Sequence, residues 1–277
     1  MVIMKTTFKG QLSLIMLIEQ LYDIGCTIIS ANTDGVVIYY NNKIENEVVK
    51  IHKQWEETTK YILEDTNYNK IIFRDVNNYI ADIIDENENH IKYKFKGCYE
   101  IDKDYHKNHS KRIVAIAAFN YFINGIEPCI TIKEHLNDIK YDFCENYGIF
   151  DFCIGSKMTG KNVLHERIIT NNSITDIPLG KVNRYYVSKT GNQLIKILPP
   201  LEKNYRTDTD KFKEKHPNQL NMFDFIEDET LVEPKNRETN IEAGWKCTLF
   251  NKYKKKDNYN LSLNYYISEI NKLINLE

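Results

Sequence analysis

The hydrophobic positions of the chain first follow a helical period and then alternate as in strands. Between residues 9 and 24, apolar side chains stand at positions 12, 15, 16, 18, 21 and 24, which predicts an amphipathic helix ending at Gly25. Two runs rich in β-branched and aromatic residues, 26–30 and 36–40, predict short strands. The Asp34-Gly35 pair between them is typical of a tight hairpin in which glycine takes a positive φ.

The same reasoning predicts the elements up to the middle of the chain. Residues 43–66 place apolar side chains on one face of a polar helix, and residues 69–85 alternate as two strands. From 91 to 96, lysines alternate with apolar residues, which predicts a half-buried strand with three ammonium groups on its open face. Gly97 then permits a bend.

Helices are predicted in the middle of the chain and short strands after them. Residues 111–124 predict a helix capped by Ser110, and residues 131–134 form a capping box for a helix reaching about residue 146. Short strands and turns follow, residues 201–245 predict a loop, and a helix closes the sequence. We therefore expect an α+β fold, with one domain over residues 1–105 and a second over residues 106–277.

Composition excludes some classes of protein. No apolar run approaches the ~18 residues of a membrane span, so we expect no membrane partner. The six cysteines are scattered without a paired motif, which argues against a thiolate zinc site and fits the cytoplasm. The formal net charge of −2 excludes a uniformly basic protein. Positive charge is nevertheless concentrated locally, with a net of +4 over residues 90–112 and +6 over residues 155–215.

Two features have the chemistry of a polynucleotide enzyme, and each has a plain structural alternative. A carboxylate held at a hairpin tip, such as Asp34, suits Mg²⁺, although Asp-Gly turns are also common for conformational reasons alone. Lys92, Lys94 and Lys96 would stand about 6–7 Å apart on one strand face, a spacing that suits successive phosphates. The same lysines could instead protect an exposed sheet edge from pairing.

Residues 10–40, GQLSLIMLIEQLYDIGCTIISANTDGVVIYY, resemble the palm domain of family B DNA polymerases of phage type. In that family a helix leads into a hairpin with the motif YGDTDS, whose second Asp binds the catalytic metals. The present sequence keeps Thr33 and Asp34, and has Asn32 and Gly35 where the pattern has Asp and Ser. The segment from Lys92 to Gly97 resembles the family's KKxYxG strand, and later stretches such as NRYYVSKTGNQLIK and LNYYISEINKLI resemble its C-terminal part.

The resemblance implies a partial palm followed by a helix-rich thumb with short C-terminal strands. It implies that Asp34 is the catalytic metal ligand of a two-Mg²⁺ site, that residues 32, 33 and 35 shape its hairpin, and that Lys92, Lys94, Lys96 and Gly97 hold primer–template DNA. The family's first palm carboxylate, its fingers motif and its exonuclease domain have no counterpart here. We therefore expect an N-terminal polymerase half to act as partner, dNTP to bind the complete enzyme, and this chain to be inactive alone.

Two other interpretations stay open at this point. The chain could be a non-catalytic remnant of a polymerase that keeps only its grip on nucleic acid. It could also be a structural protein whose acidic stretches bind partners and whose hairpin is only a turn, which predicts no affinity for DNA at moderate salt. If the chain is phage-encoded, its compartment is the bacterial host cytoplasm.

Overall fold

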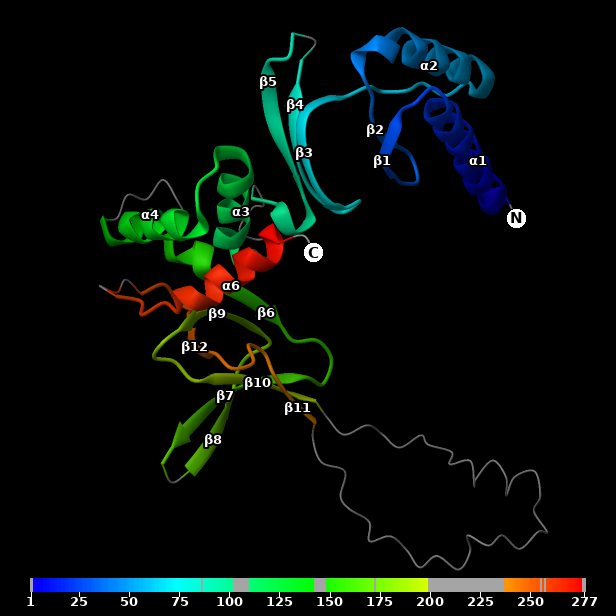
Figure 1. The fold of residues 1–277 in the computed structure, drawn as a ribbon. Helices are drawn as coiled ribbons and strands as arrows, with labels where there is room; N and C mark the ends of the chain where they lie inside the picture. Colours follow the sequence, from blue (N-terminus) through cyan, green and yellow to red (C-terminus); the bar gives the residue numbers. More distant parts are fainter. Residues whose placement is uncertain are drawn as a thin grey trace, which may run out of the picture. The chain divides into compact units, whose positions relative to one another are not determined.

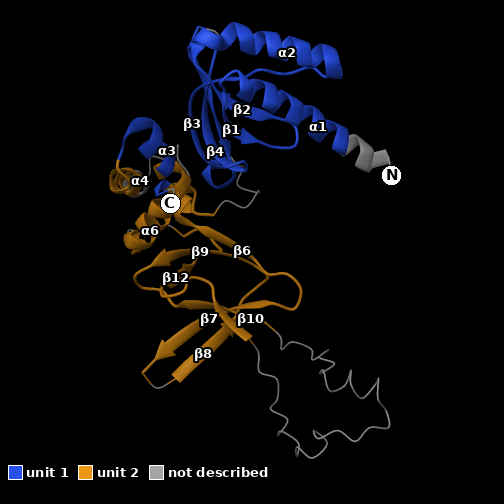
Figure 2. Ribbon diagram, turned by 45° about the vertical axis from the view of Figure 1, so that its right-hand side comes forward, with its two compact units in different colours: residues 1–102, 118–126, 274–277 blue, residues 103–117, 127–273 orange. Residues whose placement is uncertain are grey.

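The computed structural model describes residues 2–85, 87–101, 110–141, 148–171, 173–198, 237–254, 256 and 258–275. Its helices and small antiparallel sheets confirm the predicted α+β class (Figure 1). The chain divides into two compact units (Figure 2). Unit 1 comprises residues 1–102, 118–126 and 274–277, and unit 2 comprises residues 103–117 and 127–273.

Unit 1 begins with two helices that pack around a β-hairpin. Helix α1 (Val2–Asp23) starts before the predicted residue 9, and it is followed by strands β1 (Thr27–Ala31) and β2 (Val36–Tyr39). After the short helix η1 (Asn42–Ile44), helix α2 (Glu45–Thr59) ends where Lys60 takes a left-handed conformation, seven residues before the predicted end. Their shared core contains Leu17, Leu21, Cys26, Val48 and Trp55.

The second part of unit 1 is a three-stranded antiparallel sheet in the order β3-β4-β5. Its strands are β3 (Asn67–Asp75), β4 (Asn78–Ile84) and β5 (His90–Lys96), and helix η2 (Gly97–Tyr99) follows. Ile80 and Ala81, adjacent in the central strand β4, are both fully buried, so both faces of the sheet are covered there. On one face, Phe119 packs edge-on against Tyr93 and Phe95 with ring centroids 5.0 and 5.4 Å apart.

Unit 2 contains helices followed by short strands, the order expected from the sequence. Helices α3 (Arg112–Asn124, divided between the units) and α4 (Pro128–Tyr141) precede helix η4 (Gly148–Phe152). One sheet has the order β12-β9-β6 and the other β11-β10-β7-β8. Helix α6 (Leu263–Ile274) closes the fold. The strands are β6 (Ile154–Lys157), β7 (Val163–Thr170), β8 (Ser173–Pro178), β9 (Val182–Ser188), β10 (Gln193–Leu198), β11 (Arg237–Asn240) and β12 (Lys246–Leu249).

The predicted cap of one helix and the predicted first residue of another are wrong. Ser110 does not cap α3, because its hydroxyl accepts a hydrogen bond from the Gly155 backbone N–H, and Lys111 precedes the helix with a positive φ of 55°. Helix α4 begins at Pro128 rather than Thr131, since proline has the helical φ already set and lacks the N–H that the first turn leaves unpaired.

The predicted loop over residues 201–245 is also wrong in its last part. Residues 237–240 form strand β11, which pairs with β10 through backbone hydrogen bonds. All four of its side chains are exposed, so no hydrophobic alternation marked the strand in the sequence. Residues 201–236 lie outside the described part of the chain, as do residues 142–147 at the predicted end of the second helix.

Gly97 occupies a position that no other residue fits without a shift of the backbone. It has a φ of +66°, and a Cβ atom placed on it would lie 2.2 Å from both the carbonyl oxygen of Asn77 and Oδ1 of Asn78. That same Oδ1 accepts a hydrogen bond of 2.8 Å from the Cys98 backbone N–H. The end of β5 is therefore held directly against the turn between β3 and β4.

We predict that Gly97→Ala lowers the free energy of unfolding by about 3 kcal/mol, because the methyl group adds a clash to the strain of a left-handed conformation. Gly125→Ala is the matched control. Gly125 has a φ of +68° in the same unit with nothing within 4 Å of its Cβ position, so its cost is the conformational strain of about 1–2 kcal/mol. Urea unfolding of both variants measures the difference, and equal costs would contradict the close approach.

Candidate functional site

The β1–β2 hairpin presents Asp34 at an exposed tip, as the sequence predicts. Ala31 pairs with Val36, and the backbone N–H of Asn32 donates to the carbonyl oxygen of Gly35 at 2.9 Å, which closes a four-residue loop. Within the loop, the Asp34 N–H donates to Oδ1 of Asn32 at 3.1 Å. Asn32, Thr33 and Asp34 are exposed, and Gly35 is half-buried.

The predicted role of Gly35 in this turn is wrong. Gly35 is not among the described residues with positive φ, so the loop does not use the left-handed glycine of a two-residue hairpin. The Asn32 side chain stabilises the closed loop from within, since an Asn carboxamide can accept a hydrogen bond from the backbone two residues on. Asn32 thus shapes the loop that carries Asp34.

Asp34 offers an oxygen donor of the kind that Mg²⁺ prefers, but it is a single donor. Among the described residues, no group of three or more His, Cys, Asp or Glu side chains is arranged to hold a metal ion. A two-metal centre at this hairpin would need at least one further carboxylate beside Asp34.

Strand β5 carries the predicted row of lysines on one face of the sheet. Lys92, Lys94 and Lys96 lie opposite Ile83, Ala81 and Tyr79 of β4. Lys94 and Lys96 place their Nζ atoms 6.0 and 5.7 Å from the centroid of the Tyr79 ring. Strand β5 is at the edge of its sheet, so both interpretations of the row, phosphate binding and edge protection, fit this geometry.

A buried carboxylate on the other face of this sheet was missed by the sequence analysis. Asp82 on β4 accepts a hydrogen bond from Nδ2 of Asn69 at 2.9 Å, and its Oδ1 lies 2.5 Å from Nδ1 of His90. The hydrogen bond from Asn69 and the one from His90 lower the pKa of Asp82, against the effect of burial. The three residues come from three strands, so only the register of the sheet brings them together.

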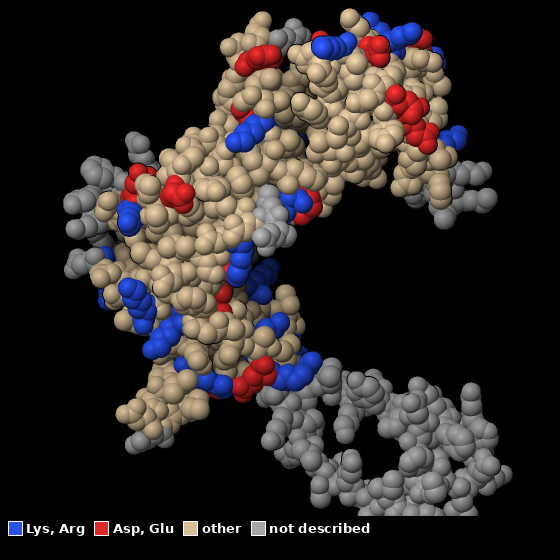
Figure 3. Space-filling model, in the orientation of Figure 1, with Lys and Arg blue, Asp and Glu red and all other residues tan. Residues whose placement is uncertain are grey.

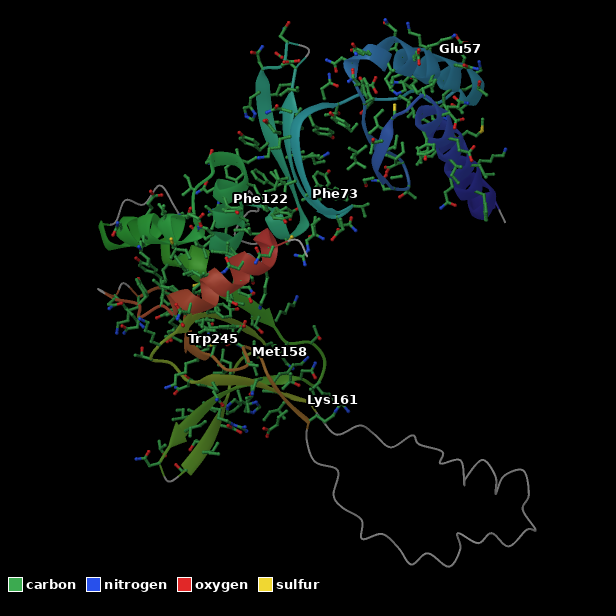
Figure 4. All side chains as sticks on the ribbon, viewed as in Figure 1. Glu57, Phe73, Phe122, Met158, Lys161 and Trp245 are labelled. Atoms are coloured by element: carbon green, nitrogen blue, oxygen red, sulfur yellow. The ribbon has the colours of Figure 1, made fainter. Side chains whose placement is uncertain are left out.

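In unit 2, the basic region predicted over residues 155–215 is described up to residue 198. Arg167 forms a two-pronged ion pair with Asp176 and a further contact with Glu238, so its charge is compensated. Lys157 and Lys189 are exposed, and Lys181 donates to two backbone carbonyls at the turn that bears Lys161. Basic side chains accordingly reach the surface of unit 2 (Figure 3), and Figure 4 labels Lys161 on the turn between β6 and β7.

Other polar side chains of unit 2 are engaged in internal pairs. Asp151 is fully buried between Arg112 of α3 and His135 of α4, at 3.2 and 3.0 Å. The Glu242 carboxylate accepts from the hydroxyl groups of Tyr185 and Tyr265. Loss of a partner would leave the buried charge of Asp151 uncompensated, and Glu242 is already bonded to two hydroxyl groups, so we assign both carboxylates to the fold.

No protein-family model matches this chain, and no curated protein sequence matches it. The helices in the described part of the chain include none that is both long and apolar enough to cross a membrane.

We predict that Asp82 makes stability depend on acid pH. Its folded-state pKa lies below the unfolded value of about 3.9, so its contribution is present above that value and is lost as the pH falls through the folded-state pKa. Asp82→Asn should lower the free energy of unfolding by about 1–2 kcal/mol at pH 7 through weakened hydrogen bonds.

Urea unfolding of the wild type and Asp82→Asn between pH 7 and pH 3 measures this difference. The difference in the free energy of unfolding between the wild type and Asp82→Asn should become smaller toward pH 3. Asp23→Asn, which removes an exposed carboxylate at the end of α1, serves as the control and should show a small gap at every pH. If the difference between the wild type and Asp82→Asn is the same at every pH, ionisation of Asp82 does not contribute to stability.

Proposed function

We propose that the chain is the palm and thumb portion of a phage-type DNA polymerase, which binds primer–template DNA and supplies one carboxylate for nucleotidyl transfer. The observation that carries the proposal is the β1–β2 hairpin, which follows helix α1 and holds Asp34 exposed on a closed loop. This is the local order, helix, strand, carboxylate turn and strand, on which the resemblance to the family rests.

Asp34 would bind Mg²⁺ together with a second carboxylate supplied from outside the 277 residues. The metal ions would activate the primer 3′-hydroxyl and stabilise the charge that develops as the phosphoryl group transfers from dNTP. The contribution of this chain would be to fix the position of the Asp34 carboxylate. The pairing of Ala31 with Val36 and the hydrogen bond between the Asp34 N–H and Asn32 fix the backbone that bears it.

The lysines of β5 would position the duplex without reading its sequence. Lys92 and Lys94 are exposed, on the same face and two residues apart, so each can neutralise a phosphate. Lys96 is half-buried, and its Nζ donates to the carbonyl oxygen of Val76 at 3.3 Å, so it has less freedom to reach a phosphate. Gly97 contributes by fixing the end of the strand.

A second polypeptide would find an apolar surface on α1. The face of this helix opposite Leu17 and Leu21 exposes large apolar side chains, namely Phe8, Leu12, Ile15, Met16 and Tyr22. A helix in a fully covered fold would bury such a stripe. Its place in the unit that carries Asp34 supports the proposal that the partner polymerase half docks here.

We predict that Asp34→Asn lowers the rate of DNA synthesis at least about a hundredfold, because a neutral amide cannot replace a carboxylate on Mg²⁺. The measurement is primer extension with Mg²⁺ and dNTPs, on this chain copurified with the product of the adjacent upstream reading frame. The control Asp23→Asn removes an exposed carboxylate of the same unit and should leave extension unchanged. Near-wild-type synthesis by Asp34→Asn would refute the metal role.

We predict that replacing Lys92 and Lys94 together by alanine weakens duplex binding uniformly across DNA sequences. The logarithm of the DNA-binding constant falls as the logarithm of the salt concentration rises. This fall should become shallower by about 2 in slope, one unit for each lost phosphate contact. Filter binding or anisotropy at several salt concentrations measures it. The pair Lys43→Ala and Lys50→Ala, also exposed in unit 1, is the control, and an unchanged slope in Lys92→Ala/Lys94→Ala would mean that these lysines only protect the sheet edge.

The second candidate is a non-catalytic nucleic-acid-binding remnant. The observation in its favour is that no group of three or more His, Cys, Asp or Glu side chains among the described residues is arranged to hold a metal ion. It predicts retained DNA binding with no extension, either by the chain alone or by the copurified pair. Primer extension by the copurified pair, but not by this chain alone, would favour the proposed palm and thumb portion of a polymerase.

A further inference from the structure

An exposed tyrosine in unit 2 stands on a base of packed aromatic rings. Tyr253, in the segment after β12, is 60% exposed. Its ring stacks on that of Phe150, with centroids 6.0 Å apart and planes inclined by 25°, and meets Phe250 edge-on at 6.2 Å. Phe250 is itself buried and packs against Phe150 at 5.5 Å. One face of Tyr253 is therefore supported while much of the ring lies open to solvent.

The segment that bears Tyr253 is held at both ends. At its start, Phe250 donates its backbone N–H to the carbonyl oxygen of Arg184, and Oδ1 of Asn251 accepts from the Arg184 N–H at 2.7 Å. At its end, the Tyr259 ring packs on Phe250 and on Tyr186, with centroids 6.1 and 5.9 Å apart. An exposed aromatic ring that is fixed in this way loses little conformational entropy when a ligand stacks on it.

Basic residues lie next to Tyr253 in the chain and contact the rings near it. Lys252 and Lys254 flank Tyr253 in the chain and are exposed, and Lys256 is exposed beyond them. Lys256 donates from Nζ to the Tyr186 hydroxyl at 3.1 Å, and the Arg184 guanidinium lies 5.2 Å from the centroid of the Phe150 ring. In sequence, residues 252–257 contain four lysines and a single Asp.

We propose that Tyr253 is a stacking platform for a base of single-stranded nucleic acid, with Lys252 and Lys254 neutralising the adjacent phosphates. An open aromatic face beside cationic groups is the arrangement by which proteins bind single strands without reading their sequence. A duplex fits less well, because its bases already stack on one another and offer no free face. The inference goes beyond the polymerase proposal and does not rest on it, since it requires neither Asp34 nor a metal ion.

The test is fluorescence anisotropy of a labelled 20-nucleotide oligo-dT with the full chain in EDTA. Tyr253→Ala should weaken binding about tenfold, since loss of one stacked base costs about that factor. Tyr253→Phe should bind as the wild type does. Tyr61→Ala, which removes an exposed tyrosine after α2 in the other unit, is the matched control and should leave the affinity unchanged.

A second variant keeps the test independent of any loss of folding in Tyr253→Ala. Tyr253→Trp should gain a fluorescence quench on addition of oligo-dT, beyond that of the wild type with Trp55 and Trp245. No added quench, or wild-type affinity in a folded Tyr253→Ala, would overturn the proposal. Equal weakening of oligo-dT and of a 20-base-pair duplex by Tyr253→Ala would also overturn it, because stacking on a free base would then not be the cause.

Discussion

The carboxylate hairpin depends on the packing of helix α1 against helix α2, which the Trp55 side chain fixes. Its indole Nε1 donates to the carbonyl oxygen of Ser13 at 2.7 Å, while the ring is buried in the core that includes Leu17 and Leu21. A two-stranded hairpin is marginally stable by itself in water, so β1 and β2 need this helical base. Asp34 is held in place because the hydrogen bond and the core orient both helices around the strands.

Local sequence patterns were sufficient to predict most elements of this hairpin region, because these elements follow one another closely in the chain. Helical periodicity and the two β-branched runs predicted α1, β1 and β2 with errors at the ends only. The mechanism of the turn was predicted wrongly: the Asp-Gly pair favoured a left-handed glycine, whereas a backbone hydrogen bond closes a four-residue loop and the Asn32 side chain accepts from the Asp34 N–H within it. Both solutions use turn residues, and the sequence pattern does not distinguish them.

The features that sequence reasoning missed join residues far apart in the chain. Asp82 meets His90 and Asn69 only through the register of three strands, and strand β11 is defined by its backbone pairing with β10. The aromatic rings that support Tyr253 include that of Phe150, which lies about a hundred residues earlier in the chain. Such contacts leave no periodic signal, since periodicity reports which side of an element is buried and not what covers it.

A net charge of −2 gives a poor description of the surface that a polyanion would meet. In unit 2, several carboxylates are paired with groups of the same chain: Asp151 with Arg112 and His135, Asp176 with Arg167, and Glu242 with the hydroxyl groups of two tyrosines. The lysines around Tyr253, by contrast, remain exposed, and so do Lys92 and Lys94 in unit 1. The proposed binding of phosphates at these lysines is compatible with a net charge of −2, and it would be sensitive to salt because the lysines are exposed.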